Sequence, residues 1–287
     1  MRYGLVLEGG GVRGAYTAGA LDVLAREKMK FYSVYGISAG ACNALSFLSG
    51  QIGRNREIFS QYIQDKRYVS AGNLLRGGSM FGFDFIFGPM FHELLPFDYD
   101  AFYSSPMGYE AGATDLETGT IIYFNKSNLG DGMEAVRASS AQPFLSHPIR
   151  HMGKKLLDGS VAQAIPLRRA VESGCEKNIV ILTRDDSYRK EEKPEYPRSV
   201  IRARYCRYPA FAEALCHRGE VYNQLRRECI EREKQGDAIV IRPSTPITMS
   251  AFCRDPAELM ELYSMGVQDA AARLSEIREF MQNQQKG

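Results

Sequence analysis

The sequence has no tryptophan, only four histidines and no two cysteines at CxxC spacing. Zinc sites and redox motifs depend on such clusters, so we expect no metal and no cofactor. The cysteines are scattered and are expected to be free thiols. They are Cys42, Cys175, Cys206, Cys216, Cys229 and Cys253.

Long apolar runs and blocks of one charge are also missing. Only a few apolar residues precede Gly9, too few for a signal peptide or a membrane span, so the expected location is the cytoplasm. The net charge of +2, with no long Lys/Arg run, argues against a nucleic-acid partner. The 287 residues, 44% of them hydrophobic, have no Ser/Gly/Pro-rich linker and predict one large domain. The composition specifies no oligomeric state.

Predicted strands and helices alternate in the first part of the chain. Apolar runs over 3–7 and 31–37 predict strands, and helical patterns follow them over 13–26 and 41–48. Further strands are predicted over 109–114, 119–124, 155–157, 178–183 and 238–242, and helices over 133–141, 208–235 and 256–282, the last being one helix or a pair. A polar stretch before Ser199 is expected to be a mobile surface loop. This order predicts a three-layer α/β/α fold with a mainly parallel sheet and a helical C-terminal extension.

A serine stands at the second of these strand-to-helix turns. Gly36-Ile37-Ser38-Ala39-Gly40 has the GxSxG pattern of a nucleophile elbow, in which small neighbours permit a sharp turn that exposes the hydroxyl. The pattern alone is weak and also describes an ordinary glycine-rich turn. Its position at the end of a strand and the start of a helix favours a nucleophile.

A glycine-rich turn follows the first strand. Gly9-Gly10-Gly11-Val12-Arg13-Gly14 can aim several backbone N–H groups at one anion, and three interpretations compete: a phosphate-binding turn, an oxyanion hole, and a turn without a ligand. A dinucleotide fold needs an acidic residue about 20 positions on, and a Walker A loop needs a lysine after its second glycine. No Asp or Glu occurs between Glu27 and Glu57, and Gly14 is followed by Ala15, so an oxyanion hole is favoured.

The nucleophile needs a base, and no histidine is a convincing candidate. His92 and His147 precede the best acid candidate in the chain, and His151 lies in a basic, polar segment just upstream of a predicted strand. His217 lies in a predicted helix, where a structural role is more common. Asp158 lies in Leu157-Asp158-Gly159-Ser160, and Asp-Gly taken alone is favoured as an ordinary turn pair. For Asp115 the turn interpretation is the better one.

Taken together, the motifs resemble the patatin-like phospholipase family, whose pattern is a GGGxRG turn, a GxSxG nucleophile and a later Asp-Gly pair. They stand in that order in this sequence, and the segments 113–119 and 138–144 between them are also similar to bacterial members. The resemblance covers about residues 3–183. One position departs from it, since Ser160 stands where the family usually has Gly or Ala, and its hydroxyl could bond the Asp158 carboxylate and lower its basicity.

This resemblance implies a serine hydrolase that cleaves acyl esters of lipids, of the phospholipase A or lysophospholipase type. Ser38 would be the nucleophile and Asp158 the proton acceptor, with an acyl-enzyme intermediate. The implied oxyanion hole consists of Gly10, Gly11, Val12 and Arg13, and the motif glycines are Gly9, Gly14, Gly36, Gly40 and Gly159. Residues 3–183 would form the catalytic core and 184–287 an extension packed on the same domain.

Two further surfaces bear on the substrate. Seven phenylalanines crowd residues 81–102 and predict either core packing or the wall of an acyl-chain channel, in which case truncating Phe85 and Phe87 would change chain-length preference. Arg198, Arg202, Arg204 and Arg207 predict a solvated basic face or a transient contact with a membrane surface. The alternatives are a carboxylesterase or thioesterase acting on soluble acyl groups, or a nucleotide-binding protein that uses the glycine turn.

Overall fold

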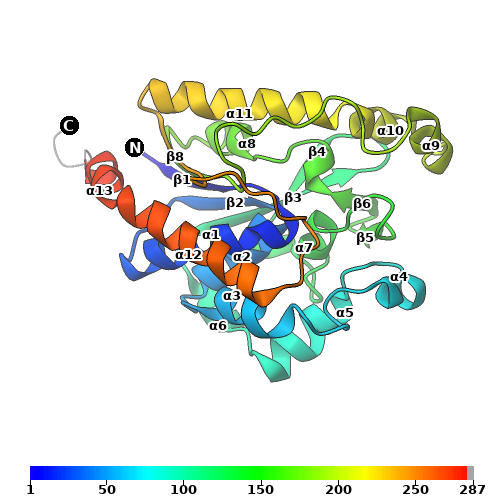
Figure 1. Ribbon diagram of the computed structural model, residues 1–287, viewed down its shortest axis with the longest axis horizontal. Helices are drawn as coiled ribbons and strands as arrows, with labels where there is room; N and C mark the ends of the chain where they lie inside the picture. The colour runs from blue at the N-terminus through cyan, green and yellow to red at the C-terminus, as the bar shows by residue number, and fades with distance from the viewer. Residues whose placement is uncertain (283–287) are drawn as a thin grey trace.

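A computed structural model describes residues 1–282 and shows one central sheet between two layers of helices (Figure 1). The strand order is β5-β6-β3-β2-β1-β7-β8, with β4 paired to β3. From β3 to β8 the neighbours are parallel, whereas β4, β5 and β6 join antiparallel. The strands are β1 (Tyr3–Leu7), β2 (Ser33–Ile37), β3 (Gly108–Asp115), β4 (Ile121–Asn125), β5 (Ile149–His151), β6 (Lys154–Asp158), β7 (Lys177–Ile181) and β8 (Ala238–Ile241). The predicted three-layer fold with a mainly parallel sheet is confirmed.

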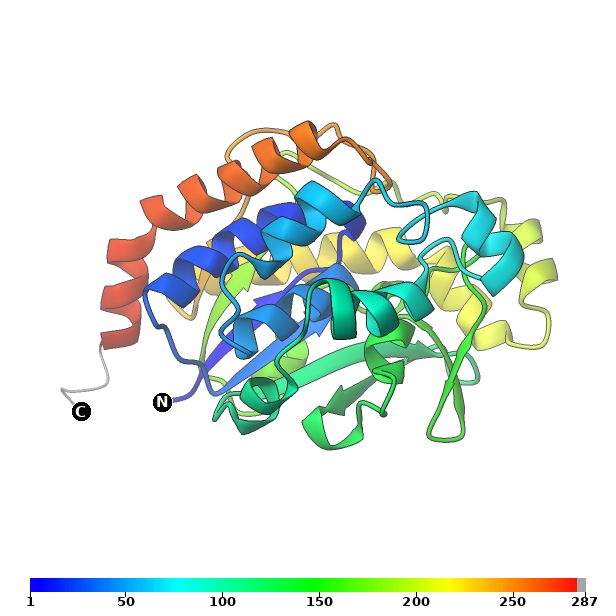
Figure 2. The same ribbon diagram turned by 90° about the horizontal axis from the view of Figure 1, so that it is seen from below.

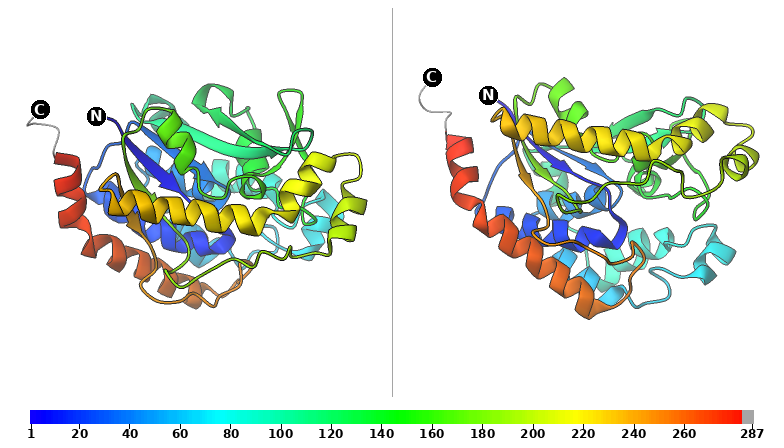
Figure 3. Two further views of the ribbon diagram at one scale, coloured as in Figure 1. Left: turned by 90° about the horizontal axis from the view of Figure 1, so that it is seen from above. Right: turned by 45° about the horizontal axis from the view of Figure 1, so that its top comes forward.

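Helices cover the two faces of the sheet unequally. Leu5 and Leu7 of β1 point into a large core with α1, α2 and α12, whereas Val6 points into a smaller core with α8 and α11. This alternation follows from the two-residue period of a strand that is buried on both faces. The larger layer consists of α1 (Gly14–Arg26), α2 (Ala39–Leu48), α3 (Arg54–Glu57) and α12 (Pro256–Ala272), and Figure 2 shows α12 lying along α1. The smaller consists of α8 (Leu167–Glu172) and α11 (Arg218–Lys234), and Figure 3 shows α11 crossing this face.

Shorter elements connect the layers. The aromatic stretch 81–102 forms short helical turns on both sides of one π-helical segment, Ile86–Leu94. The remaining elements are η1 (Gly11–Arg13), η2 (Ile58–Tyr62), α4 (Ala71–Gly77), α5 (Phe83–Phe85), η3 (Ile86–Leu94), α6 (Tyr99–Ser104), η4 (Lys126–Asn128), α7 (Glu134–Ser139), η5 (Gly159–Val161), α9 (Arg198–Arg204), α10 (Pro209–Cys216) and α13 (Leu274–Gln282).

The predicted elements differ from the observed ones in several places. All seven predicted strands are present, but the short strand β5, the helices between residues 54 and 104, and the helices α8 and α9 were not predicted. The helix predicted over 208–235 is two helices, because the backbone of His217 (φ −102°, ψ 6°) interrupts it. The helical region predicted over 256–282, as one helix or a pair, is confirmed and consists of α12 and α13. The stretch between β7 and α9 has no helix or strand, as expected for a loop.

Candidate active site

Ser38 occupies a strained turn between β2 and α2. Its backbone has φ 52° and ψ −121°, a conformation that L-residues avoid and that is found at sites where the fold forces it. The turn requires glycine on both sides. A Cβ on Gly36 would lie 2.6 Å from the Ala41 nitrogen, and one on Gly40 would lie 2.5 Å from the Leu7 carbonyl oxygen. The sharp elbow presents the Ser38 hydroxyl beyond the end of the sheet.

Asp158 reaches Ser38 because two strands end at the same place along β3. Gly112 of β3 pairs with Ile37 of β2 and with Tyr123 of β4, whereas Ala113 pairs with Asp158 of β6 and with Ile122 of β4. Since β4 takes one edge of β3, β2 and β6 share the other, and their C-terminal ends meet there. The Ser38 hydroxyl donates a hydrogen bond of 3.0 Å to Oδ2 of Asp158.

The carboxylate of Asp158 lies in a desolvated place. The residue is 1% exposed, and burial raises the pKa of its carboxyl above the ordinary value. The positive charge of Arg218 and hydrogen bonds from Ser160 and Ser38 oppose that rise and offset it only partly. The Ser160 N–H donates to Oδ1 at 2.8 Å, which fixes the carboxylate and leaves Oδ2 for the serine. A carboxyl with a raised pKa is a stronger base than an exposed one once it is ionised.

The glycine turn lies beside the elbow, and its four expected donors are not equivalent. The N–H groups of Gly10 and Gly11 have no hydrogen-bond partner among residues 1–282. The Val12 N–H donates to the carbonyl of Ala251 at 3.2 Å, and the Arg13 N–H donates to Gly10 at 3.3 Å. Gly10 and Gly11 therefore have the amides that are available to an oxyanion, and those of Val12 and Arg13 are engaged.

The remaining motif glycines let the glycine turn and the turn after Asp158 pack closely against neighbouring residues. The Gly9 N–H donates to Ala164 at 3.1 Å, and a Cβ on Gly14 would lie 2.9 Å from that of Ala39 at the start of α2. A Cβ on Gly159 would lie 2.3 Å from the Gly112 carbonyl oxygen. Asp115 ends β3 and accepts hydrogen bonds from the Glu117 N–H and from Lys154, which agrees with a structural role at the turn.

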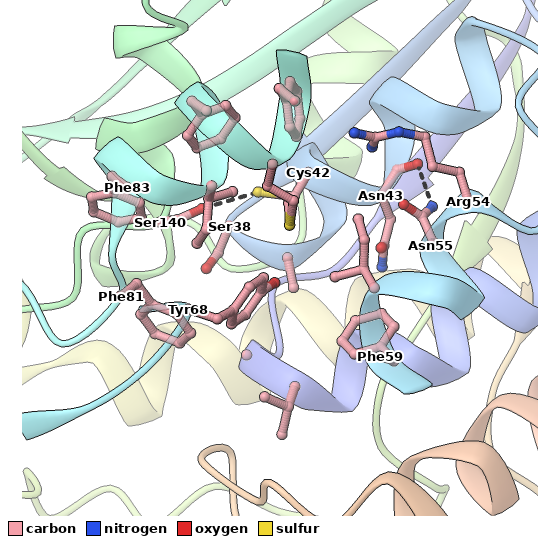
Figure 4. A pocket seen from close by; sticks show the side chains of 18 of the residues that line it. Ser38, Cys42, Asn43, Arg54, Asn55, Phe59, Tyr68, Phe81, Phe83 and Ser140 are labelled. Atoms are coloured by element: carbon pink, nitrogen blue, oxygen red, sulfur yellow. Dashed lines mark hydrogen bonds between the residues drawn. The ribbon is translucent and has the colours of Figure 1, made fainter. Parts of the chain in front are cut away.

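An apolar chamber opens on one side of Ser38 (Figure 4). It has an empty volume of about 750 Å³ and reaches from Ser38 and Cys42 to the segment 54–59. Figure 4 shows Phe81, Phe83 and Tyr68 around the serine. Its other aromatic and aliphatic walls come from Ile58, Phe59, Ile86, Phe87, Met90 and Phe91. Thus most of the crowded phenylalanines are buried and several also line the cavity, but Phe85, one of the two proposed for truncation, does not.

A polar chamber opens on the other side of the same serine. It has an empty volume of about 710 Å³, and both chambers share Gly11, Ser38 and Gln142. Its charged lining residues are Glu8, Arg13, Asp158, Arg184, Lys190, Glu195 and Arg218. Glu8 is occupied by the Tyr222 hydroxyl and the Thr183 N–H, and Nε of Arg13 is buried without a hydrogen-bond partner. This side of the serine is therefore rich in cationic groups.

Neither chamber is lined by a histidine. His217 lies outside both and bonds Glu213 and Glu220 at 3.0 and 3.1 Å. The sequence assigned no role to Gln142 or to Ser139, whose hydroxyl accepts the Ser38 N–H at 2.8 Å, although both lie in the segment 138–144 that resembles the family. Arg218 lies outside that resemblance, and only its place in the fold identifies it.

Comparison with known proteins finds two families along the chain. The family described as patatin-like phospholipase matches residues 5–171, and a domain of unknown function (DUF6363) matches residues 208–282. The uncharacterized protein YjjU of Escherichia coli (strain K12) is 31% identical over 196 residues, which are 63% of this chain and 52% of that protein. The chain thus spans about half the length of this curated relative. The crystal structure of VipD from Legionella pneumophila aligns with a TM-score of 0.47 and 14% identity over 96% of this chain and 67% of that one.

Proposed function

This chain belongs to the patatin-like phospholipase family, and from that premise we propose that it is a serine hydrolase that cleaves acyl esters of lipids. The observation that carries the proposal is the 3.0 Å hydrogen bond from the Ser38 hydroxyl to Asp158 at a strained elbow. A serine is a weak nucleophile unless a neighbouring base removes its proton, and here the only side chain bonded to that hydroxyl among residues 1–282 is the buried carboxylate.

The proposed reaction has two steps. Asp158 takes the Ser38 proton while the oxygen attacks the ester carbonyl, and the free amides of Gly10 and Gly11 hold the resulting oxyanion. Each such donor contributes about 3–4 kcal/mol of transition-state stabilisation in measured cases. Asp158 then returns the proton to the leaving alcohol, and water releases the acyl group from Ser38 by the same route in reverse.

The two chambers support a lipid rather than a small soluble ester. An acyl chain fits the apolar chamber between Phe81, Phe83 and Phe87, and the polar alcohol part fits the cationic chamber on the far side of Ser38. The closest alternative, a carboxylesterase or thioesterase acting on short acyl groups, predicts that activity does not rise with chain length. Hydrolysis of short nitrophenyl esters compared with phospholipid vesicles separates these two functions.

Contact with a membrane surface and a cytoplasmic location stay proposals. Among residues 1–282, no helix combines the length and apolarity that crossing a bilayer demands. In the basic face of α9, Arg198 and Arg202 lie 3.8 and 3.4 Å from Glu213, which reduces the charge they offer to a lipid surface. Sedimentation with anionic liposomes at low and high salt tests the contact, and the lack of salt-sensitive binding would rule it out.

Labelling with a serine-reactive fluorophosphonate tests the proposed function directly. The wild-type protein should be labelled at Ser38, the Ser38→Ala variant should not, and Asp158→Asn should be labelled far more slowly because the hydroxyl loses its base. Labelling of Ser38→Ala at the wild-type rate would refute the proposal. The nucleotide-binding alternative predicts no labelling and an increase in melting temperature with ATP or NAD.

A further inference from the structure

Arg218 enters the polar chamber from outside the family match. It is the first residue of α11, directly after the break at His217, and lies within the region that matches the domain of unknown function. A Cβ on the next residue, Gly219, would lie 2.1 Å from the Glu191 carbonyl oxygen, so the start of α11 is pressed against the loop 190–192. This close packing defines where the Arg218 side chain points.

The guanidinium of Arg218 forms hydrogen bonds to the turn that carries Asp158. Its Nε donates to the Ser160 carbonyl at 3.1 Å, and an Nη donates to the Ser160 hydroxyl at 2.7 Å. Two donors in a planar fork fix both the distance and the angle of the residue they hold. Ser160 in turn holds Asp158, because its N–H donates to Oδ1 at 2.8 Å.

The hydroxyl of Ser160 explains the departure from the family pattern. Glycine or alanine at this position could accept only one of the two hydrogen bonds, through its carbonyl. In the structure the Ser160 hydroxyl accepts from Arg218, and the backbone N–H of Ser160 bonds the carboxylate. The Ser160 side chain also lowers the pKa of Asp158, in the direction expected from the sequence. Ser160 and Arg218 therefore form a pair that joins the serine-bearing part of the chain to the C-terminal part.

We infer that Arg218 is a positioning residue for the proposed hydrolysis: acting through Ser160 it holds the Asp158 carboxylate toward Ser38. The inference rests on the proposed function. The side chain of Arg218 is 23% exposed, so water screens its charge less than that of a surface arginine.

Several other charged groups share the chamber and bear on the pH dependence. Glu195 lies 3.7 Å from Arg218 and 3.1 Å from Lys190, so it partly neutralises both cations. The other titratable groups are Glu8, Arg13, Arg184, Tyr188 and Tyr222 in the chamber and the thiol of Cys42, which faces Asp158 from α2. Burial raises the pKa of Asp158 and Arg218 is the largest influence that lowers it, so loss of the arginine charge raises that pKa further.

The experiment measures kcat, KM and the pH profile of nitrophenyl ester hydrolysis for four variants. Arg218→Gln should lower kcat about tenfold with little change in KM, as expected for lost charged hydrogen bonds, and should move the acid limb of kcat/KM to higher pH. Arg218→Lys keeps the charge but loses the fork, so the limb should stay in place while kcat falls. Ser160→Ala should lower kcat about threefold and move the limb to higher pH by less than Arg218→Gln does, because the Ser160 side chain lowers the pKa of Asp158 less than the arginine charge does. Arg227→Gln, an exposed position on the same helix, is the control and should match the wild type.

The outcomes separate this inference from the function it rests on. If Arg218→Gln keeps the wild-type kcat and acid limb while Ser38→Ala is inactive, the inference is wrong and the hydrolase proposal stands. If Ser38→Ala remains as active as the wild type, the hydrolase proposal itself fails. Should Arg218→Gln not fold, Arg218→Lys and Ser160→Ala still decide, because an unchanged kcat in both would overturn the positioning role.

Discussion

Replacing Phe87 with alanine should allow the enzyme to accept longer acyl chains, whereas replacing Phe85 should not. The two rings lie on the same segment and are 4% and 8% exposed, so each truncation costs a similar stability of about 3–5 kcal/mol. Only Phe87 lines the apolar chamber, where its ring lies 5.0 Å from that of Phe91. Phe85 faces away, with the Arg67 guanidinium 4.3 Å above its ring. The pair therefore separates loss of stability from a change of cavity shape.

The size of the effect follows from the burial of methylene groups. Each buried CH₂ contributes about 0.8 kcal/mol, which is about fourfold in kcat/KM for every carbon that the chamber accommodates. If the space left by the Phe87 ring takes two further methylenes, the preference for the longer ester rises about 15-fold relative to the wild type. The assay is kcat/KM for a ladder of nitrophenyl esters from four to sixteen carbons, about the range of common acyl chains. An unchanged ladder in folded Phe87→Ala, or an equal shift in Phe85→Ala, would refute this assignment of the chamber.

Three further predictions concern the glycine turn, the buried acid and the helix packing. Gly11→Ala should lower kcat about a hundredfold in the ester assay. Gly11 has φ +59°, and a Cβ there would lie 2.7 Å from the Ala251 carbonyl oxygen, so the substitution should displace the Gly11 amide that donates to the oxyanion. A normal kcat would show that this amide is not used. Asp158→Asn should melt at a higher temperature than the wild type at pH 8, and this difference should shrink toward pH 4. Because burial raises the pKa of the folded carboxyl, its ionisation destabilises the folded wild type at pH values above the pKa of the unfolded state. An equal difference in melting temperature at all pH values would contradict this reasoning. Gly266→Val should lower the free energy of unfolding, measured by urea denaturation, by about 1–3 kcal/mol, because a Cβ there would lie 2.1 Å from the Tyr16 carbonyl oxygen. An unchanged free energy of unfolding would mean that α12 can move away from α1.

The part of the site nearest Ser38 could be predicted because it depends on local rules. Two strand-to-helix turns on adjacent parallel strands must project at the same edge of a sheet, so the glycine turn and the elbow meet. Asp158 is different. Its approach to Ser38 requires β6 to run antiparallel along the edge of β3 where β2 has ended, and no local pattern predicts that register. Only the family resemblance indicated this residue.

The walls of both chambers could not be predicted, for a physical reason. The apolar chamber takes side chains from residues 11 to 142, and each of its segments is too short and irregular to show a period. The position of Arg218 at the start of a helix could not be predicted, because the helical sequence pattern continues through His217 although the backbone helix is interrupted there. Tertiary packing can override helix propensity in this way, and directly after the break Gly219 packs closely against the Glu191 backbone.

The C-terminal part of the chain serves the fold and the site through the same contacts. β8 extends the parallel sheet next to β7. α12 packs closely on α1 at two glycines: a Cβ on Gly19 would lie 2.1 Å from the Tyr263 carbonyl oxygen, and a Cβ on Gly266 would lie 2.1 Å from the Tyr16 carbonyl oxygen. Apolar residues of α12 and β8 are buried in the same cores as those of α1 and β1. α11, which carries Arg218, packs on β8 in the smaller core. We therefore expect that a change in this packing would also disturb the turn at Asp158 and Ser160 that Arg218 holds. The boundary between the two matched families is therefore a boundary in sequence similarity and not in the structure that the proposed chemistry requires.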